Sequence, residues 1–156
     1  MTFMVSIGSK ITDEAVLLHT GETKKLSQLV ESKNLVVYLY PKDDTPGCTA
    51  EACSIRDDYG TIQSKANIIG VSADSIKSHN GFISKYKLPF PLVSDPDLKL
   101  TKLLGAYGKK RTGGMGLLRS TFILDKNLTV LHIFGLAGYP KVTTASHAKE
   151  ILEALG

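Results

Sequence analysis

Cysteine is scarce in this chain, whose 156 residues include only Cys48 and Cys53. A disulfide-stabilised scaffold would need more cysteines, and a reducing cytosol would not maintain one. A structural zinc ion takes about four nitrogen or sulfur ligands, and His19, His132 and His147 do not have metal-ligand spacing. We therefore expect no metal, and reactive thiol chemistry is the interpretation that remains.

Long hydrophobic runs are also absent. The longest stretch without Asp, Glu, Lys or Arg, residues 127–140, is interrupted by polar residues, Gly and Pro, whereas a membrane span requires about 18 apolar residues. The first residues, MTFMVSIGSK, lack the basic region, apolar block and cleavage site of a signal peptide. These features favour a cytoplasmic protein with no membrane partner.

The excess of positive charge is small. Lys and Arg number 19 against 15 Asp and Glu, which gives a net charge of +4. Nucleic-acid-binding proteins usually concentrate their basic residues, and here only residues 109–111 (Lys-Lys-Arg) form a basic run. We interpret this run as a solvated loop and expect no nucleic-acid partner.

The composition is that of an ordinary globular protein, with 42% hydrophobic and 22% charged residues and no repeat or linker. We expect one domain over residues 1–156. Apolar, β-rich runs predict strands at Leu35–Tyr40, Ala66–Ser72, Thr121–Leu124 and Leu128–Phe134. Helical spacing predicts helices over Thr49–Ser64, Ser75–Tyr86 (after an Asp74 N-cap), Leu98–Leu104 and Thr144–Leu155. This alternation predicts an α/β fold with a mixed central β-sheet flanked by helices.

The segment richest in chemistry is Tyr40 to Cys53, YPKDDTPGCTAEAC. It follows a buried strand, turns through Pro and Gly, and enters a helix at Cys48. Free backbone N–H groups and the helix dipole stabilise a thiolate at such a position. The alternative is a small buried cysteine that packs against the sheet, and position alone does not separate the two.

The pattern Pro41-x-x-x-Thr45-x-x-Cys48 resembles the PxxxTxxC signature of the peroxiredoxins. The longer segment is similar to the bacterioferritin comigratory protein, or peroxiredoxin Q, subfamily, whose fold is thioredoxin-like. Residues 10–18 depart from the Pro-Asp-Phe element that members carry near the start. Further matching motifs are Ser72-Ala-Asp-Ser75, Ser78-His79, Leu88-Pro-Phe-Pro-Leu92, Ser94-Asp95 and Arg119-Ser-Thr-Phe-Ile.

The resemblance implies a role for each matched residue. Cys48 would be the peroxidatic cysteine, which attacks peroxide and becomes a sulfenic acid. Thr45 would hydrogen-bond the peroxide, and Arg119 would bind the thiolate and the developing oxyanion. Pro41 would shield the thiol, and Cys53 would be the resolving cysteine. Residue type alone would favour a surface charge at the start of a strand for Arg119, and the motif match reverses this interpretation.

The spacing of the two cysteines restricts how they could pair. Five residues along an ideal helix place the Cα atoms about 8.6 Å apart, whereas disulfides seldom span more than about 6.8 Å. Either the start of the helix unwinds on oxidation, or Cys53 is a buried core residue. The family resemblance favours unwinding.

Three other features have ordinary structural interpretations. Glu51 could join the hydrogen bonding of the active site, but a Glu in the first turn of a helix is adequately explained by the helix dipole. His79 is interpreted as a surface or capping residue. Residues 112–116, Thr-Gly-Gly-Met-Gly, lack the Lys-Ser/Thr of a phosphate loop and predict a flexible loop that leads to Arg119.

The sequence thus predicts a monomeric peroxidase for hydrogen peroxide and organic hydroperoxides, with no metal, haem or flavin. By resemblance, thioredoxin or a glutaredoxin-like protein would reduce it. One rival function is a thiol–disulfide oxidoreductase, although such enzymes favour Cys-x-x-Cys spacing. The other is a redox sensor or holdase, which need not turn over.

Overall fold

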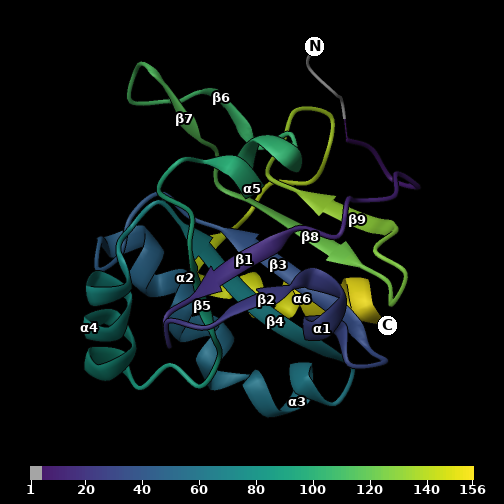
Figure 1. Ribbon diagram of the computed structural model, residues 1–156, viewed down its shortest axis with the longest axis horizontal. Helices are drawn as coiled ribbons and strands as arrows, with labels where there is room; N and C mark the ends of the chain where they lie inside the picture. The colour runs from purple at the N-terminus through teal and green to yellow at the C-terminus, as the bar shows by residue number, and fades with distance from the viewer. Residues whose placement is uncertain (1–4) are drawn as a thin grey trace.

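A seven-stranded mixed sheet forms the centre of the computed structural model, which describes residues 5–156 (Figure 1). The strand order is β2-β1-β5-β4-β3-β8-β9. Strands β3, β4 and β5 are parallel to one another, and the strands outside them pair antiparallel. Their bounds are β1 Ala15–Leu18, β2 Thr23–Lys25, β3 Asn34–Leu39, β4 Ala66–Ser72, β5 Leu92–Ser94, β8 Ser120–Leu124 and β9 Val130–Phe134. The expected mixed central sheet is confirmed.

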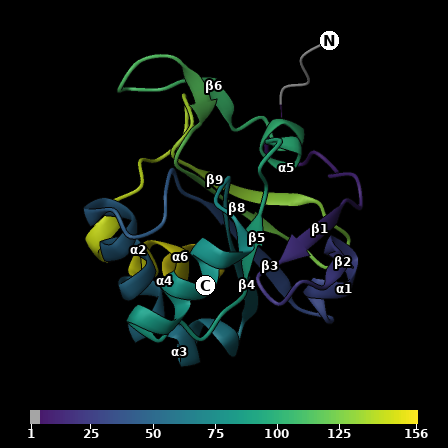
Figure 2. The ribbon, with the colours of Figure 1, turned by 60° about the vertical axis from the view of Figure 1, so that its left-hand side comes forward.

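Helices cover both faces of this sheet. Figure 2 shows α2, α3, α4 and α6 on one side and α1 and α5 on the other. The helices are α1 Leu26–Val30, α2 Pro46–Asp57, α3 Tyr59–Gln63, α4 Ile76–Tyr86, α5 Lys99–Leu103 and α6 His147–Leu155, preceded by the 3-10 helix η1, Thr144–Ser146. Among the described residues, no helix has the length and apolar character needed to cross a membrane.

Strand β3 separates two hydrophobic cores, because successive side chains of a strand point to opposite faces. Leu35, Val37 and Leu39 belong to the core beneath α1 and α5. Val36 and Tyr38 belong to the core beneath α2, α4 and α6, which also contains Cys48. The strand is therefore apolar throughout, and its C-terminal end delivers the chain to the turn before α2.

Some helix boundaries differ from the predicted ones. Helix α2 begins at Pro46, two residues before Cys48, because proline suits the first turn of a helix. The helix expected over residues 49–64 is divided at Asp58, whose backbone is not helical. Ser75, not Asp74, caps α4: its side chain accepts a hydrogen bond of 3.1 Å from the N–H of Ser78.

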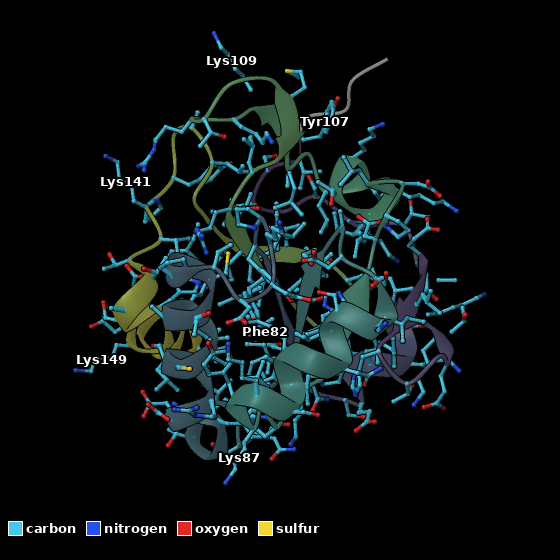
Figure 3. The ribbon with its side chains drawn as sticks, turned by 90° about the vertical axis from the view of Figure 1, so that its left-hand side faces the viewer. Phe82, Lys87, Tyr107, Lys109, Lys141 and Lys149 are labelled. Carbon is cyan, nitrogen blue, oxygen red and sulfur yellow. The ribbon has the colours of Figure 1, made fainter. Side chains whose placement is uncertain are left out.

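The loop expected at residues 112–116 belongs to a β-hairpin. Strands β6 (Tyr107–Lys109) and β7 (Met115–Leu117) form a separate two-stranded sheet. Figure 3 shows Tyr107 and Lys109 on this hairpin, away from the body of the molecule. The basic run at residues 109–111 therefore lies at the end of β6 and in the hairpin turn.

Candidate active site

Cys48 lies in the first turn of α2, at the carboxyl end of β3. Its side chain is buried, with only 1% of the residue exposed. Pro46 has no N–H, and the first backbone bond of the helix runs from Thr49 N–H to the Thr45 carbonyl at 2.8 Å. The N–H groups of Gly47 and Cys48 thus precede the helical ladder, where the positive end of the helix dipole favours an anion.

Arg119 donates hydrogen bonds both to the sulfur of Cys48 and to the buried carboxylate of Glu51. It directly precedes β8, which pairs with β3. Nη2 donates to Cys48 Sγ at 3.3 Å, and Nη1 donates to Glu51 Oε1 at 2.5 Å. Burial alone would lower the pKa of Arg119, but Glu51 and Cys48 outweigh it and raise the pKa. The guanidinium is therefore a permanent cation held against the thiol.

Gly135 fixes the backbone position of Arg119. This glycine follows β9 and has φ +89°, a conformation that other residues rarely adopt. A Cβ atom there would lie 2.3 Å from the Arg119 carbonyl oxygen and 3.0 Å from Ser120 Cα. Because both atoms belong to the backbone, they cannot move aside as a flexible side chain would.

Glu51 is fully buried one turn beyond Cys48. Burial raises the pKa of Glu51 to about 7, against the opposing effect of Arg119. Its Oε2 has no hydrogen-bond partner among residues 5–156 and lies 3.9 Å from His147 Nε2. The explanation of Glu51 by the helix dipole alone was therefore incomplete, because its carboxylate binds the active-site cation.

His147, at the start of α6, completes the inner side of the site. Its Nδ1 lies 2.8 Å from Glu150 Oε1, and its Nε2 lies 2.7 Å from Thr121 Oγ1. Burial lowers the pKa of His147, although the Glu150 carboxylate opposes this. At neutral pH the ring is uncharged, donating to Glu150 through Nδ1 and accepting from Thr121 at Nε2.

Thr45 and Pro41 lie on the turn before α2, and among the described residues the hydroxyl of Thr45 does not hydrogen-bond the sulfur. Thr45 is the N-cap residue of α2, but its hydroxyl donates to the Lys42 carbonyl at 2.9 Å instead of capping the helix. The Thr45 oxygen keeps lone pairs that can accept a hydrogen bond. Pro41 is exposed at the start of the turn.

Both cysteines are free thiols within the uninterrupted helix α2. Cys48 is buried and Cys53 is half-buried. The ideal-helix separation of about 8.6 Å between their Cα atoms therefore applies to this state, and it exceeds the reach of a disulfide.

Sequence reasoning did not find His147 and preferred to explain Glu51 by the helix dipole. Glu51 lies three residues after Cys48, a spacing that places both on one helix face, and this was an available signal. His147 follows Cys48 by almost a hundred residues, so only the fold brings them together. His79 is fully buried, so its interpretation as a surface or capping residue was wrong.

The AhpC/TSA family matches residues 7–133 of this chain. The chain is 39% identical to peroxiredoxin Bcp of Bacillus subtilis, covering 97% of this chain and 95% of that protein. It superimposes on the crystal structure of Xylella fastidiosa PrxQ with a TM-score of 0.88, at 31% identity and covering 98% and 96% of the two chains. For the bacterioferritin comigratory protein of Xanthomonas campestris the TM-score is 0.84, with 34% identity and coverage of 97% and 95%.

A thioredoxin-like fold with a buried cysteine at a helix start, bound by arginine, defines a thiol-dependent peroxidase. The chain belongs to the AhpC/TSA family, in its Bcp/peroxiredoxin Q branch. The expected fold and family are both confirmed.

Proposed function

We propose that the protein reduces hydrogen peroxide and organic hydroperoxides with Cys48 as peroxidatic and Cys53 as resolving cysteine. The observation that carries the proposal is the 3.3 Å hydrogen bond from Arg119 to Cys48 Sγ. A thiol–disulfide oxidoreductase would not need this cation. The Xanthomonas campestris relative has alkyl peroxide reduction activity, which supports including organic hydroperoxides among the substrates.

In the first step, the Cys48 thiolate attacks one peroxide oxygen and the O–O bond breaks. Sulfur keeps that oxygen as a sulfenic acid, and the departing oxygen leaves as an alkoxide or hydroxide that takes up a proton. Arg119 stabilises the negative charge as it moves from sulfur to the departing oxygen. Thr45 accepts a hydrogen bond from the peroxide hydroxyl, and Pro41 shields the thiol from solvent.

In the second step, the first turns of α2 unwind and the Cys53 thiol attacks the sulfenic sulfur. A Cys48–Cys53 disulfide forms and water leaves. A dithiol protein, thioredoxin or a glutaredoxin-like protein, then reduces the disulfide and is itself oxidised.

Peroxide consumption with thioredoxin, thioredoxin reductase and NADPH tests this cycle, with a glutaredoxin system as a parallel arm. Cys48→Ser should lose turnover, because a hydroxyl cannot replace the thiolate. Cys53→Ser should react with one equivalent of peroxide and then stop as a sulfenic acid, which mass spectrometry detects. Turnover by Cys48→Ser would contradict the assignment of the nucleophile. Single oxidation of the wild type without recycling by either system would favour a redox sensor.

A further inference from the structure

A second group of buried and half-buried polar side chains lies behind the turn that leads to Cys48. We call it the Asp43 anchor; it consists of Tyr40, Asp43, Asp74, Ser78 and His79. These residues come from the end of β3, the turn before α2, the loop after β4 and the first turn of α4. His79 is fully buried and Asp43 is 7% exposed, so their mutual contacts are shielded from water.

The Asp43 carboxylate has three hydrogen-bond partners. Its carboxylate accepts from the Tyr40 hydroxyl at 2.6 Å and from the Ser78 hydroxyl at 2.8 Å, and it lies 2.8 Å from His79 Nδ1. Its backbone N–H donates to Asp74 Oδ2 at 2.8 Å. Such contacts hold both the side chain and the backbone of this turn residue.

Both nitrogens of the His79 ring have hydrogen-bond partners. Nε2 lies 2.9 Å from the Val93 carbonyl, which can only accept, so this nitrogen carries a hydrogen. Nδ1 faces the Asp43 carboxylate, which also receives two hydroxyl groups. The His79 ring therefore links Asp43 to the backbone of β5.

A metal ion does not fit this cluster well. Ligand atoms of Asp43, Asp74 and His79 lie within 4.8 Å of one another. However, both His79 nitrogens are committed to acceptors, and Asp74 Oδ2 accepts from the Ser72 hydroxyl and from the Asp43 N–H. The contacts are those of a structural anchor.

The anchor holds the turn that positions the active site. Asp43 lies between Lys42 and Asp44, and the Lys42 carbonyl receives the Thr45 hydroxyl. Asp44 has φ +57°, in the left-handed region that costs energy for residues other than glycine. A turn with such a residue needs fixed contacts, and three residues after it the chain is already in the first turn of α2.

We propose that His79 is a positioning residue for the peroxide reaction. Through its two ring nitrogens it fixes Asp43, and Asp43 fixes the turn that carries Thr45 and begins the helix of Cys48. His79 acts through Asp43 and does not touch the reacting atoms. The inference rests on the proposed peroxidase function, for which Thr45 and the start of α2 must hold their places during attack.

The test measures the second-order rate of sulfenic acid formation, by stopped flow, in His79→Leu, Asp43→Asn and the double variant. Removal of one partner of a buried pair leaves the other uncompensated, so we expect each single variant to lose about tenfold or more. Because the two residues act as one unit, the double variant should fall no further than the slower single variant, within about threefold. Lys85→Gln is the matched control: it breaks the exposed pair, 2.7 Å apart, between Lys85 of α4 and Asp44 of the same turn as Asp43. Its rate should stay within about twofold of wild type.

A second measurement does not depend on the folding of any variant. In the wild-type protein labelled with ¹⁵N, the ring hydrogen on Nε2 of His79 should exchange slowly with solvent, because it is buried against the Val93 carbonyl. Rapid exchange of this hydrogen would overturn the proposal. So would a folded His79→Leu variant that reacts within about twofold of wild type, or rate losses that multiply in the double variant. Failure of the wild type itself to reduce peroxide would instead count against the proposed function.

Discussion

The hydroxyl of Ser54 accepts a hydrogen bond of 3.1 Å from the backbone N–H of Ala148. Ser54 directly follows Cys53 on α2, and Ala148 is the second residue of α6, where N–H groups have no partner within their own helix. The contact therefore ties the middle of α2 to α6 immediately beyond the resolving cysteine. The Asp43 anchor holds the chain on the other side of Cys48, so the segment that must unwind lies between two fixed points.

Oxidation should accordingly quicken hydrogen exchange over residues 48–56. The amides at the end of this range are included because an N–H loses its acceptor when the turn four residues earlier unwinds. Strand β3 should remain protected. The experiment compares reduced and oxidised wild type, with peroxide-treated Cys53→Ser as the control that cannot form the disulfide. Protected amides in an oxidised protein with a Cys48–Cys53 bond would contradict the unwinding mechanism.

Replacing Arg119 should slow peroxide attack. Arg119→Ala removes the donor to the sulfur and to the departing oxygen, and the expected loss in stopped-flow rate is about 100-fold or more. Arg119→Lys should recover only part of this rate, because one ammonium group cannot reproduce the fork that bonds both Cys48 and Glu51. Arg111→Ala, on the hairpin, removes the same charge as a control. A rate for Arg119→Ala near that of the control would contradict the role of Arg119.

Glu51 should make stability depend on pH. Its folded-state pKa is raised from 4.5 to about 7, so between these values the native protein holds a proton that the unfolded chain releases. The stability this provides is present below about pH 4.5 and is lost as the pH rises to about 7. The free energy of unfolding of wild type, relative to Glu51→Gln, should therefore fall across this range, by on the order of 3 kcal/mol. Urea denaturation at several pH values measures it, and a constant difference would mean that Glu51 does not titrate there.

Gly135→Ala should impair peroxide reduction through the backbone of Arg119. The new Cβ would meet the Arg119 carbonyl oxygen at 2.3 Å, so β8, β9 or both must shift. Gly138→Ala is a matched control, because Gly138 has the same φ of +89° but nothing within 4 Å of the added atom. Both variants should lose about 1 kcal/mol or more from the strained conformation. Only Gly135→Ala should also lose rate, by about tenfold; equal rates would show that the contact does not position Arg119.

Sequence periodicity predicted the strands and helices that are long and strongly patterned. Ala66–Ser72 was predicted to the residue, because a continuous β-rich run has few other structures available. The short strands β1, β2, β5, β6 and β7 were missed, since three or four residues are too few to show a period. In the hairpin, the Gly-rich segment forms the expected loop at residues 112–114, but Met115 and Gly116 pair with Lys109 and Gly108 of β6.

The motif placed Cys48 and Arg119 together, and the structure gives them a direct hydrogen bond. The partners of Arg119 and of the turn before α2 could not be found in the same way. Glu51 and His79 resemble ordinary helix residues in the sequence. Their burial and their ion pairs arise from tertiary packing, which local patterns do not encode.

The burial of Cys48 limits which molecules can reach its sulfur in each conformation of α2. With 1% of the residue exposed, the sulfur of the folded helix is out of reach of the surface of another protein. A protein reductant would meet the sulfur only after α2 has unwound. Peroxide would thus react with the sulfur while α2 is folded, and the protein reductant would react with it while α2 is unwound. The two would not compete for the sulfur.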